Sequence, residues 1–316
     1  MNKNSFIISI LLIVTLFSCE KQDSFEILSK EKVLIVDGII TNGPDDNYIK
    51  LSLSDTKFYD SLMYFNSALP VNNAFVIVSD DMGNIDTLSR RYFYSYNEQH
   101  KLDSTANTTG IYDIRKIKGK PGHSYFLYIK HLNKEYRAST FMNEVPLLDT
   151  LKFDKTWDPV KSQDYYPPLV SFKKLQSPEN YYFFVISIGY MNSYCMESSY
   201  EMLDQLGGRS FNMTILDDAH LSSYVSGLDV GKCKAPDYWI TSYTWANPGD
   251  SVKVRMFSAT KEGYQYFDAL FNQIDNDGGI FNPAPTTPKG NISNGAMGYF
   301  GASAVSKIKG TVKTNN

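Results

Sequence analysis

Histidines and carboxylates are numerous enough to allow hydrolytic or metal chemistry, but their spacing selects no active site. The four histidines, at positions 100, 123, 131 and 220, form no His-Glu-x-x-His or comparable metal-binding pattern. The chain contains no Gly-x-Ser-x-Gly elbow, phosphate loop or dinucleotide fingerprint. The 34 Asp and Glu residues single out no glycosidase pair. The sequence therefore predicts no catalytic residue, metal or cofactor, and a hydrolase with an unrecognised site is kept as an alternative.

The first cysteine lies where a lipid could be attached. Lys3 precedes an apolar run from residue 6 to residue 17, which is short for a membrane span. Leu16-Phe17-Ser18-Cys19 then resembles a bacterial lipobox, in which diacylglycerol is joined to the cysteine sulfur before cleavage. We expect residues 1–18 to be a lipoprotein signal peptide, Cys19 to carry acyl chains such as palmitate, and residues 19–30 to be a polar tether. An ordinary secretory peptide that happens to end in cysteine is the alternative.

The two remaining cysteines, Cys195 and Cys233, lie in an irregular stretch between residues 192 and 238. Export would place them in an oxidising compartment, where disulfides form and persist. We expect a disulfide between them that restrains this stretch, because an even pair remains after lipidation. Two independent buried thiols are the alternative.

Paired aromatic residues in the second half of the chain could form binding platforms for a sugar or a peptide. The candidates are Tyr165, Tyr166, Tyr238, Trp239 and Trp245. Aromatic side chains on strands also pack in cores and between domains, and this interpretation is favoured over ligand contact.

Composition favours a β protein and excludes nucleic acid as a partner. Aromatic residues make up 14% of the chain, and such side chains pack well on pleated sheets. The net charge of −3 provides no general attraction to a polyanion, and Lys and Arg form no basic stripe along the sequence.

Short strand patterns separated by turns predict a mainly β fold. An immunoglobulin-like β-sandwich is expected over residues 31–145, including 33–40, 48–54, 70–78 and 124–129. A second β-rich domain is expected over residues 146–316, with 181–188 as a central strand. One helix is predicted near 261–274, capped by Thr260, and the following Asp275-Asn276-Asp277-Gly278-Gly279 is interpreted as helix termination.

Two resemblances extend these predictions. Pro70-Val71 with Ala74 and Val76, then Asp80 with Gly83, then Gly110 with Tyr112, is similar to carboxypeptidase-regulatory-like modules of immunoglobulin type. The lipobox, Leu34-Ile35-Val36-Asp37-Gly38, and above all Pro285 to Ile292 followed by Gly298-Tyr299-Phe300 and Ala302-Ser303, resemble an uncharacterised Bacteroidota lipoprotein family, catalogued as domain of unknown function 4249.

The second resemblance implies a surface lipoprotein that accompanies a TonB-dependent transporter. The expected function is thus a non-enzymatic accessory component that binds a glycan or peptide ligand for uptake, with contacts in the second domain. The expected location is the outer membrane, lipid-anchored and surface-exposed, with a periplasm-facing position left open. A structural or adhesive surface protein is the alternative.

Overall fold

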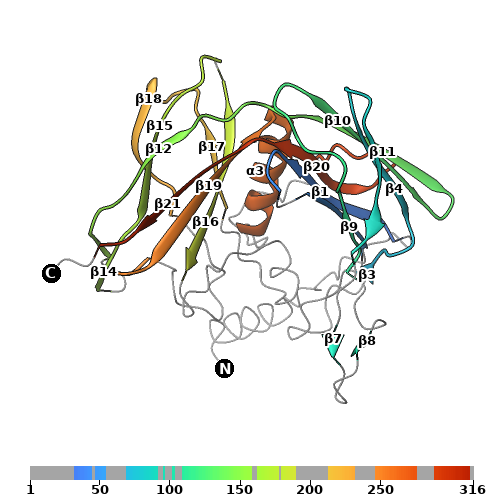
Figure 1. Ribbon diagram of the computed structural model, residues 1–316, viewed down its shortest axis with the longest axis horizontal. Helices are drawn as coiled ribbons and strands as arrows, with labels where there is room; N and C mark the ends of the chain where they lie inside the picture. The colour runs from blue at the N-terminus through green and yellow to red at the C-terminus, as the bar shows by residue number, and fades with distance from the viewer. Residues whose placement is uncertain are drawn as a thin grey trace, which may run out of the picture. The chain divides into compact units, whose positions relative to one another are not determined.

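A computed structural model describes residues 32–44, 47–54, 69–91, 95–96, 102–103, 109–158, 162–177, 179–189, 213–231, 246–275 and 288–313. These residues are mainly β, with one α-helix among them, as the sequence predicts. Four larger sheets form two layered pairs, which we call sheets A and B and sheets C and D (Figure 1). No helix within the described ranges is long and apolar enough to cross a bilayer.

Sheet A has the strand order β20-β1-β2-β9-β6, with β3 paired to β2. Its strands are β1 (Leu34–Thr41), β2 (Tyr48–Leu53), β3 (Leu69–Pro70), β6 (Ser89–Arg90), β9 (Ile111–Asp113) and β20 (Met297–Ser303). β1 runs antiparallel to β2 and parallel to β20, with Val36 opposite Gly298.

Sheet B is antiparallel, in the order β11-β10-β4-β5. Its strands are β4 (Phe75–Asp80), β5 (Ile85–Thr87), β10 (Ser124–His131) and β11 (Lys134–Phe141). The turn after β4 is closed by Asp80, whose Oδ1 accepts from Met82 N at 3.0 Å and Asn84 N at 2.8 Å. This carboxylate supplies acceptors inside the turn, which is why Asp suits its first position.

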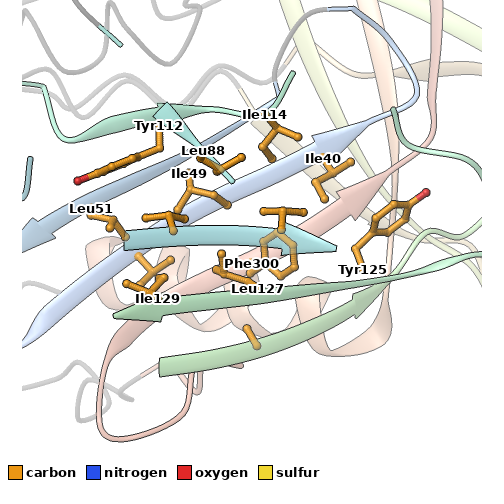
Figure 2. Close-up of a cluster of buried hydrophobic side chains, with 14 of the residues drawn as sticks. Ile40, Ile49, Leu51, Leu88, Tyr112, Ile114, Tyr125, Leu127, Ile129 and Phe300 are labelled. Atoms are coloured by element: carbon orange, nitrogen blue, oxygen red, sulfur yellow. The ribbon is translucent and has the colours of Figure 1, made fainter. Parts of the chain in front are cut away.

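Apolar side chains of sheets A and B fill one core between the two sheets (Figure 2). Ile49, Leu51 and Ile129 are fully buried in it, and Phe300 enters it from β20. Strands of both sheets alternate between buried and more exposed residues, as a half-buried strand requires. A two-sheet sandwich therefore forms in this part of the chain, and its assignment to the immunoglobulin type stays a prediction.

Sheets C and D enclose a second core. Sheet C contains β12 (Leu148–Phe153), β15 (Pro168–Lys173) and β18 (Tyr224–Asp229). Sheet D has the strand order β17-β16-β19-β21. Its strands are β16 (Tyr181–Gly189), β17 (Met213–Asp217), β19 (Ser251–Ala259) and β21 (Val305–Thr311). β16 is an inner strand, paired on both sides, so its predicted central position is confirmed. Two short hairpins complete the description: β7 (Ser95–Tyr96) with β8 (Leu102–Asp103), and β13 (Thr156–Asp158) with β14 (Gln163–Tyr165).

Helix α3 (Lys261–Asp275) confirms the predicted helix and its cap. Thr260 Oγ1 accepts from Gly263 N at 3.1 Å and lies 2.9 Å from the Tyr299 hydroxyl. Phe267 packs edge-on against Phe183 of β16 at 4.9 Å between ring centroids. The helix thus contacts β16, β17 and β20, the last of which belongs to sheet A (Figure 1).

β20 lies in the predicted second domain by sequence but pairs with a strand of the predicted first domain, on the other side of the boundary at residue 145. It follows α3 in the chain but pairs with β1 along seven residue positions, from Ile35 opposite Met297 to Thr41 opposite Ser303. The next strand, β21, returns to sheet D beside β19. Residues 146–316 therefore contribute to the first sandwich as well as to sheets C and D.

Candidate functional site

Aromatic side chains are exposed on the outer face of sheet B. On β10, Tyr125, Leu127 and Ile129 enter the core, so Phe126 and Tyr128 point outward, because side chains alternate along a strand. The outward residues of β4, β10 and β11 at its centre, here called the sheet B face, are Phe75, Ile77, Ser79, Phe126, Tyr128, Arg137 and Ser139. Phe75 and Phe126 keep 49% and 44% of their surfaces exposed, which is enough to leave part of each ring open to a ligand.

The strand register sets the side chains of the sheet B face in rows. Tyr128 lies between Ile77 and Arg137, whereas Phe126 lies between the two serines, Ser79 and Ser139. Neighbouring rows on one face of a strand are about 7 Å apart. The face therefore combines adjacent aromatic rings with hydroxyl groups on both sides.

Arg137 and Tyr128 form the polar centre of this face. The Arg137 guanidinium carbon lies 4.8 Å from the Tyr128 ring centroid, and its Nη2 lies 3.4 Å from Glu135 Oε2. Phe75 meets the same tyrosine ring edge-on, at 6.5 Å and 76°. Burial, and then the Glu135 carboxylate, raise the pKa of Tyr128, so its phenol stays protonated at neutral pH. The cluster thus presents a positioned cation and a neutral hydroxyl.

A shallow groove of about 410 Å³ lies over the sheet B face. It is lined by Ile77, Ser79, Phe126, Leu127, Tyr128, Arg137, Ala138, Ser139 and Asn291. Asn291 is held by backbone contacts: its Nδ2 donates to Phe300 O at 2.8 Å and to Ser139 O at 3.1 Å, and its Oδ1 accepts from Phe300 N. Asn291 therefore links β11 to β20 at the side of the groove.

The side chains of the sheet B face are suited to ligand contact. Rings with open surface can stack on a sugar or on apolar peptide groups, while Arg137 and the serine hydroxyls can fix a ligand's orientation. Among the described residues that line the groove, none is a carboxylate or a histidine. Among the described residues, no group of three or more His, Cys, Asp or Glu could hold a metal ion.

Most of the site residues predicted from the sequence lie outside the described ranges. These are Cys19, Cys195, Cys233, Tyr238, Trp239 and Trp245. Tyr165 is half-buried at the end of β14, opposite Thr156. Tyr166 bridges to Ala246 and packs against the core of sheets C and D. Tyr166 thus has a packing role, and ligand contact by either tyrosine stays a prediction.

A buried charged network near β16 has a structural role. Asp218 is fully buried; it accepts from Asn180 N at 2.9 Å, and Lys174 Nζ lies 3.5 Å from its carboxylate. Lys174 also donates to the backbone carbonyls of Asp218 and Leu221. Burial, then the charge of Asp218, raise the pKa of the buried Tyr182 phenol far above its usual value. The network satisfies the buried polar groups that join β16 to the end of β17.

The most distinctive sequence motif, from Pro285 to Ser303, is explained by packing where it is described. A Cβ on Gly298 would lie 1.9 Å from Val36 O, and one on Gly290 would lie 1.9 Å from Gly298 O. Gly298 also has a φ of 103°, which side chains disfavour. These glycines let three backbone segments approach closely, and Asn291 then joins them to β11.

The sheet B face was not predicted from the sequence, although a signal for it was present. Ser124 to Ile129 reads as a strand with aromatic or aliphatic residues at consecutive positions, so both of its faces carry apolar groups. In a strand with one solvent-facing side, such a pattern indicates an exposed apolar patch. The contributions of β4, β11 and Asn291 could be recognised only once the strand register was known.

Fold and face together define a β-rich protein with a shallow aromatic groove on the outside of a two-sheet sandwich. The family model described as "Domain of unknown function (DUF4249)" matches residues 20–309, nearly the whole chain after Cys19. The chain therefore belongs to this family, as its motifs indicated. A search of curated proteins returned no match.

Proposed function

We propose that this protein is a lipid-anchored outer-membrane surface protein that captures a ligand on the sheet B face for a TonB-dependent transporter. The observation that carries the binding role is the groove over exposed Phe126, half-buried Tyr128 and the guanidinium of Arg137. Binding of this kind needs a rigid scaffold and a presented surface, and it needs no reactive group.

Glycans and extended peptides are the ligand classes that fit the face. Exposed rings offer a sequence-tolerant stacking surface, and the groove is open enough to admit part of a polymer chain. The backbone groups of β10 are used in pairing with β4 and β11, so recognition depends on side chains.

The anchor part of the proposal rests on the sequence. Leu16-Phe17-Ser18-Cys19 supports lipidation at Cys19, and several buried acyl methylenes, at about 0.8 kcal/mol each, would hold the chain firmly on a membrane. The transporter partnership and the outer-membrane location rest on the family resemblance. We include the Cys195–Cys233 disulfide in the proposal, which peptide mapping of unreduced protein tests directly.

The binding role is tested with the mature chain carrying Cys19→Ser, probed with a glycan array and a library of extended peptides. Phe126→Ala should weaken binding by about tenfold or more, because a stacking ring contributes about 1 kcal/mol beyond its buried area. Trp157→Ala is the matched control, since Trp157 is also exposed, at 56%, but lies on β13 away from the face. Equal losses in both variants, or no ligand in either probe set, would contradict the proposed site.

Membrane anchoring and partnership are tested in cells. Cys19→Ala should release the protein from the membrane fraction, and wild-type protein purified from solubilised outer membrane should retain a TonB-dependent transporter. Recovery of other surface structures and no transporter would favour the adhesive alternative. Turnover of glycan, peptide or ester substrates that is lost on one Asp or Glu substitution would favour the hydrolase alternative.

A further inference from the structure

Phe126 has a hydroxyl-bearing neighbour on each side in the groove of the sheet B face. The strand register places Phe126 opposite Ser79 of β4 and opposite Ser139 of β11, and all three residues line the groove. Opposed residues on paired strands have Cβ atoms about 5 Å apart, so both serines lie within reach of a molecule that stacks on the Phe126 ring. This row therefore offers an exposed apolar ring between two hydrogen-bonding groups.

A pyranose sugar complements this row better than a peptide does. Its ring carries C–H groups on its faces and hydroxyl groups around its rim. The C–H face can stack on Phe126, while the rim hydroxyls exchange hydrogen bonds with Ser79 and Ser139. A peptide presents backbone amides, but β10 beneath the groove already uses its own backbone groups in pairing with β4 and β11. The row thus favours a glycan as the ligand.

Arg137 brings a cation into the groove beside the same row. It lies two residues from Ser139 along β11, which makes it a diagonal neighbour of Phe126, with side chains about 7 Å apart. Its guanidinium carbon is 4.8 Å from the centroid of the Tyr128 ring, so the ring supports the charged group. Among the described residues that line the groove, Arg137 is the charged one. A sugar stacked on Phe126 would therefore have an arginine next to one of its ring substituents.

Arg137 already has a carboxylate partner, and a ligand can take the place of that partner. Glu135 Oε2 lies 3.4 Å from Arg137 Nη2, and the side chains of Glu135 and Arg137 are 50% and 69% exposed. Exposed ion pairs of this kind contribute little free energy, so exchange of one carboxylate for another costs little. Lys130 lies opposite Glu135 on β10, so Glu135 keeps a basic neighbour after it releases Arg137.

We propose that the ligand of the sheet B face is an acidic glycan, built from sugars that carry a carboxylate, as uronic acids do. This inference rests on the proposed function and narrows its ligand to one chemical class. The sugar ring stacks on Phe126, Ser79 and Ser139 bind its hydroxyls, and its carboxylate binds Arg137 in place of Glu135. A guanidinium and a carboxylate match as planar, bidentate partners, which makes Arg137 the residue that determines specificity.

The test compares glycans that differ only in charge. The mature chain with Cys19→Ser is titrated by calorimetry with oligomers of galacturonate, glucuronate and mannuronate, each beside its uncharged methyl ester. At least one acid should bind about tenfold more tightly than its ester, as expected for hydrogen bonds to a charged group. This preference should decrease as salt is added, because the interaction lies at the surface.

Three variants separate the charged contact from the stacking contact. Arg137→Gln should make acid and ester bind about equally, whereas Arg137→Lys should keep part of the preference, because the charge remains without the planar fork. Glu135→Gln removes the competing carboxylate and should tighten binding of the acid about two- to threefold. Phe126→Ala should weaken acid and ester alike. Thermal unfolding of each variant shows whether a loss of binding comes from a folding defect.

Arg115→Gln is the matched control for Arg137→Gln. The Arg115 side chain is 65% exposed, and its Nη2 lies 2.9 Å from the carboxylate of Asp113, two residues earlier in the chain, as Glu135 is to Arg137. Arg115 does not line the groove. This variant should therefore keep the full preference for the acid.

Equal binding of every acid and its ester to the wild-type chain would overturn the acidic-glycan proposal. If Phe126→Ala still reduced that binding, the proposed binding face itself would stand. An acid preference that survives Arg137→Gln, or that disappears in Arg115→Gln, would also overturn it. So would binding of polyglutamate without binding of any glycan, which would indicate an acidic peptide as the ligand. Absence of binding to all glycans and peptides would overturn the proposed function together with this inference.

Discussion

Leu132 adopts a backbone conformation that its side chain disfavours. It is the first of two residues that join β10 to β11, with His131 paired to Lys134, and its φ is 54°. Glycine is the usual residue at a positive φ in two-residue hairpins, because a Cβ is crowded there. Leu132 also exposes 75% of its surface, so little burial offsets this cost.

Replacing Leu132 with glycine should therefore stabilise the protein. Leu132→Gly is expected to raise the free energy of unfolding by about 1 kcal/mol, measured by urea denaturation. Leu147→Gly is the control, since Leu147 is similarly exposed, at 78%, without a positive φ. The control should lose about 0.5 kcal/mol, because glycine adds freedom to the unfolded chain. A destabilised Leu132→Gly variant would show that the leucine makes contacts that outweigh the backbone cost.

At the scale of single elements, α3 depends on its first turn and on one aromatic face. Thr260 caps the helix at Gly263 N and also contacts the Tyr299 hydroxyl. Tyr266 stacks on Tyr299 at 5.2 Å, and Phe267 reaches both Phe183 and Tyr299. Thr260, which caps the helix, and the aromatic residues Tyr266 and Phe267 therefore fix its position against β20.

Removing the cap should weaken this element by a predictable amount. Thr260→Ala is expected to lower the free energy of unfolding by about 1 kcal/mol, because Gly263 N loses its acceptor. Thr260→Ser keeps the hydroxyl and should stay close to wild type. Urea denaturation followed by circular dichroism measures both variants. If serine and alanine behave alike, the hydroxyl is not the source of the stabilisation.

For the folded part as a whole, β20 is the element that joins the two sandwiches. It pairs with β1 in sheet A, its neighbour β21 pairs with β19 in sheet D, and Ser258 Oγ accepts from Ala304 N between them. Gly298 allows β20 to approach β1 because a Cβ there would overlap Val36 O.

Gly298→Ala should consequently destabilise the whole fold, and by more than a glycine substitution in a local turn does. We expect a loss of more than about 3 kcal/mol in the free energy of unfolding, from the overlap with Val36 O and the φ of 103° together. Gly295→Ala is the control that measures the cost of a positive φ alone, since Gly295 has a φ of 74° and no atom lies within 4 Å of its added Cβ. That control should lose about 1 kcal/mol. If thermal or urea unfolding shows similar losses of stability in Gly298→Ala and Gly295→Ala, the close approach of Gly298 to Val36 is not the source of the larger effect.

Local sequence patterns are sufficient to predict which segments form secondary structure. The strand patterns at 33–40, 124–129 and 181–188 and the helix capped by Thr260 are local signals, set by side-chain alternation, helical spacing and a capping hydroxyl. Family membership could also be predicted from the sequence, because the motif around Asn291 and Gly298 is contiguous. Close backbone contacts restrict which residues can occupy its glycine positions.

Which residues share a surface depends on how distant strands pack against one another. The sheet B face and the groove over it draw Phe75, Phe126, Arg137 and Asn291 from four separate segments. The parallel pairing of β20 with β1, about 260 residues apart, likewise crosses the boundary suggested at residue 145. Strand register and sheet order determine which side chains lie beside one another. Both depend on long-range packing, which local sequence patterns do not specify.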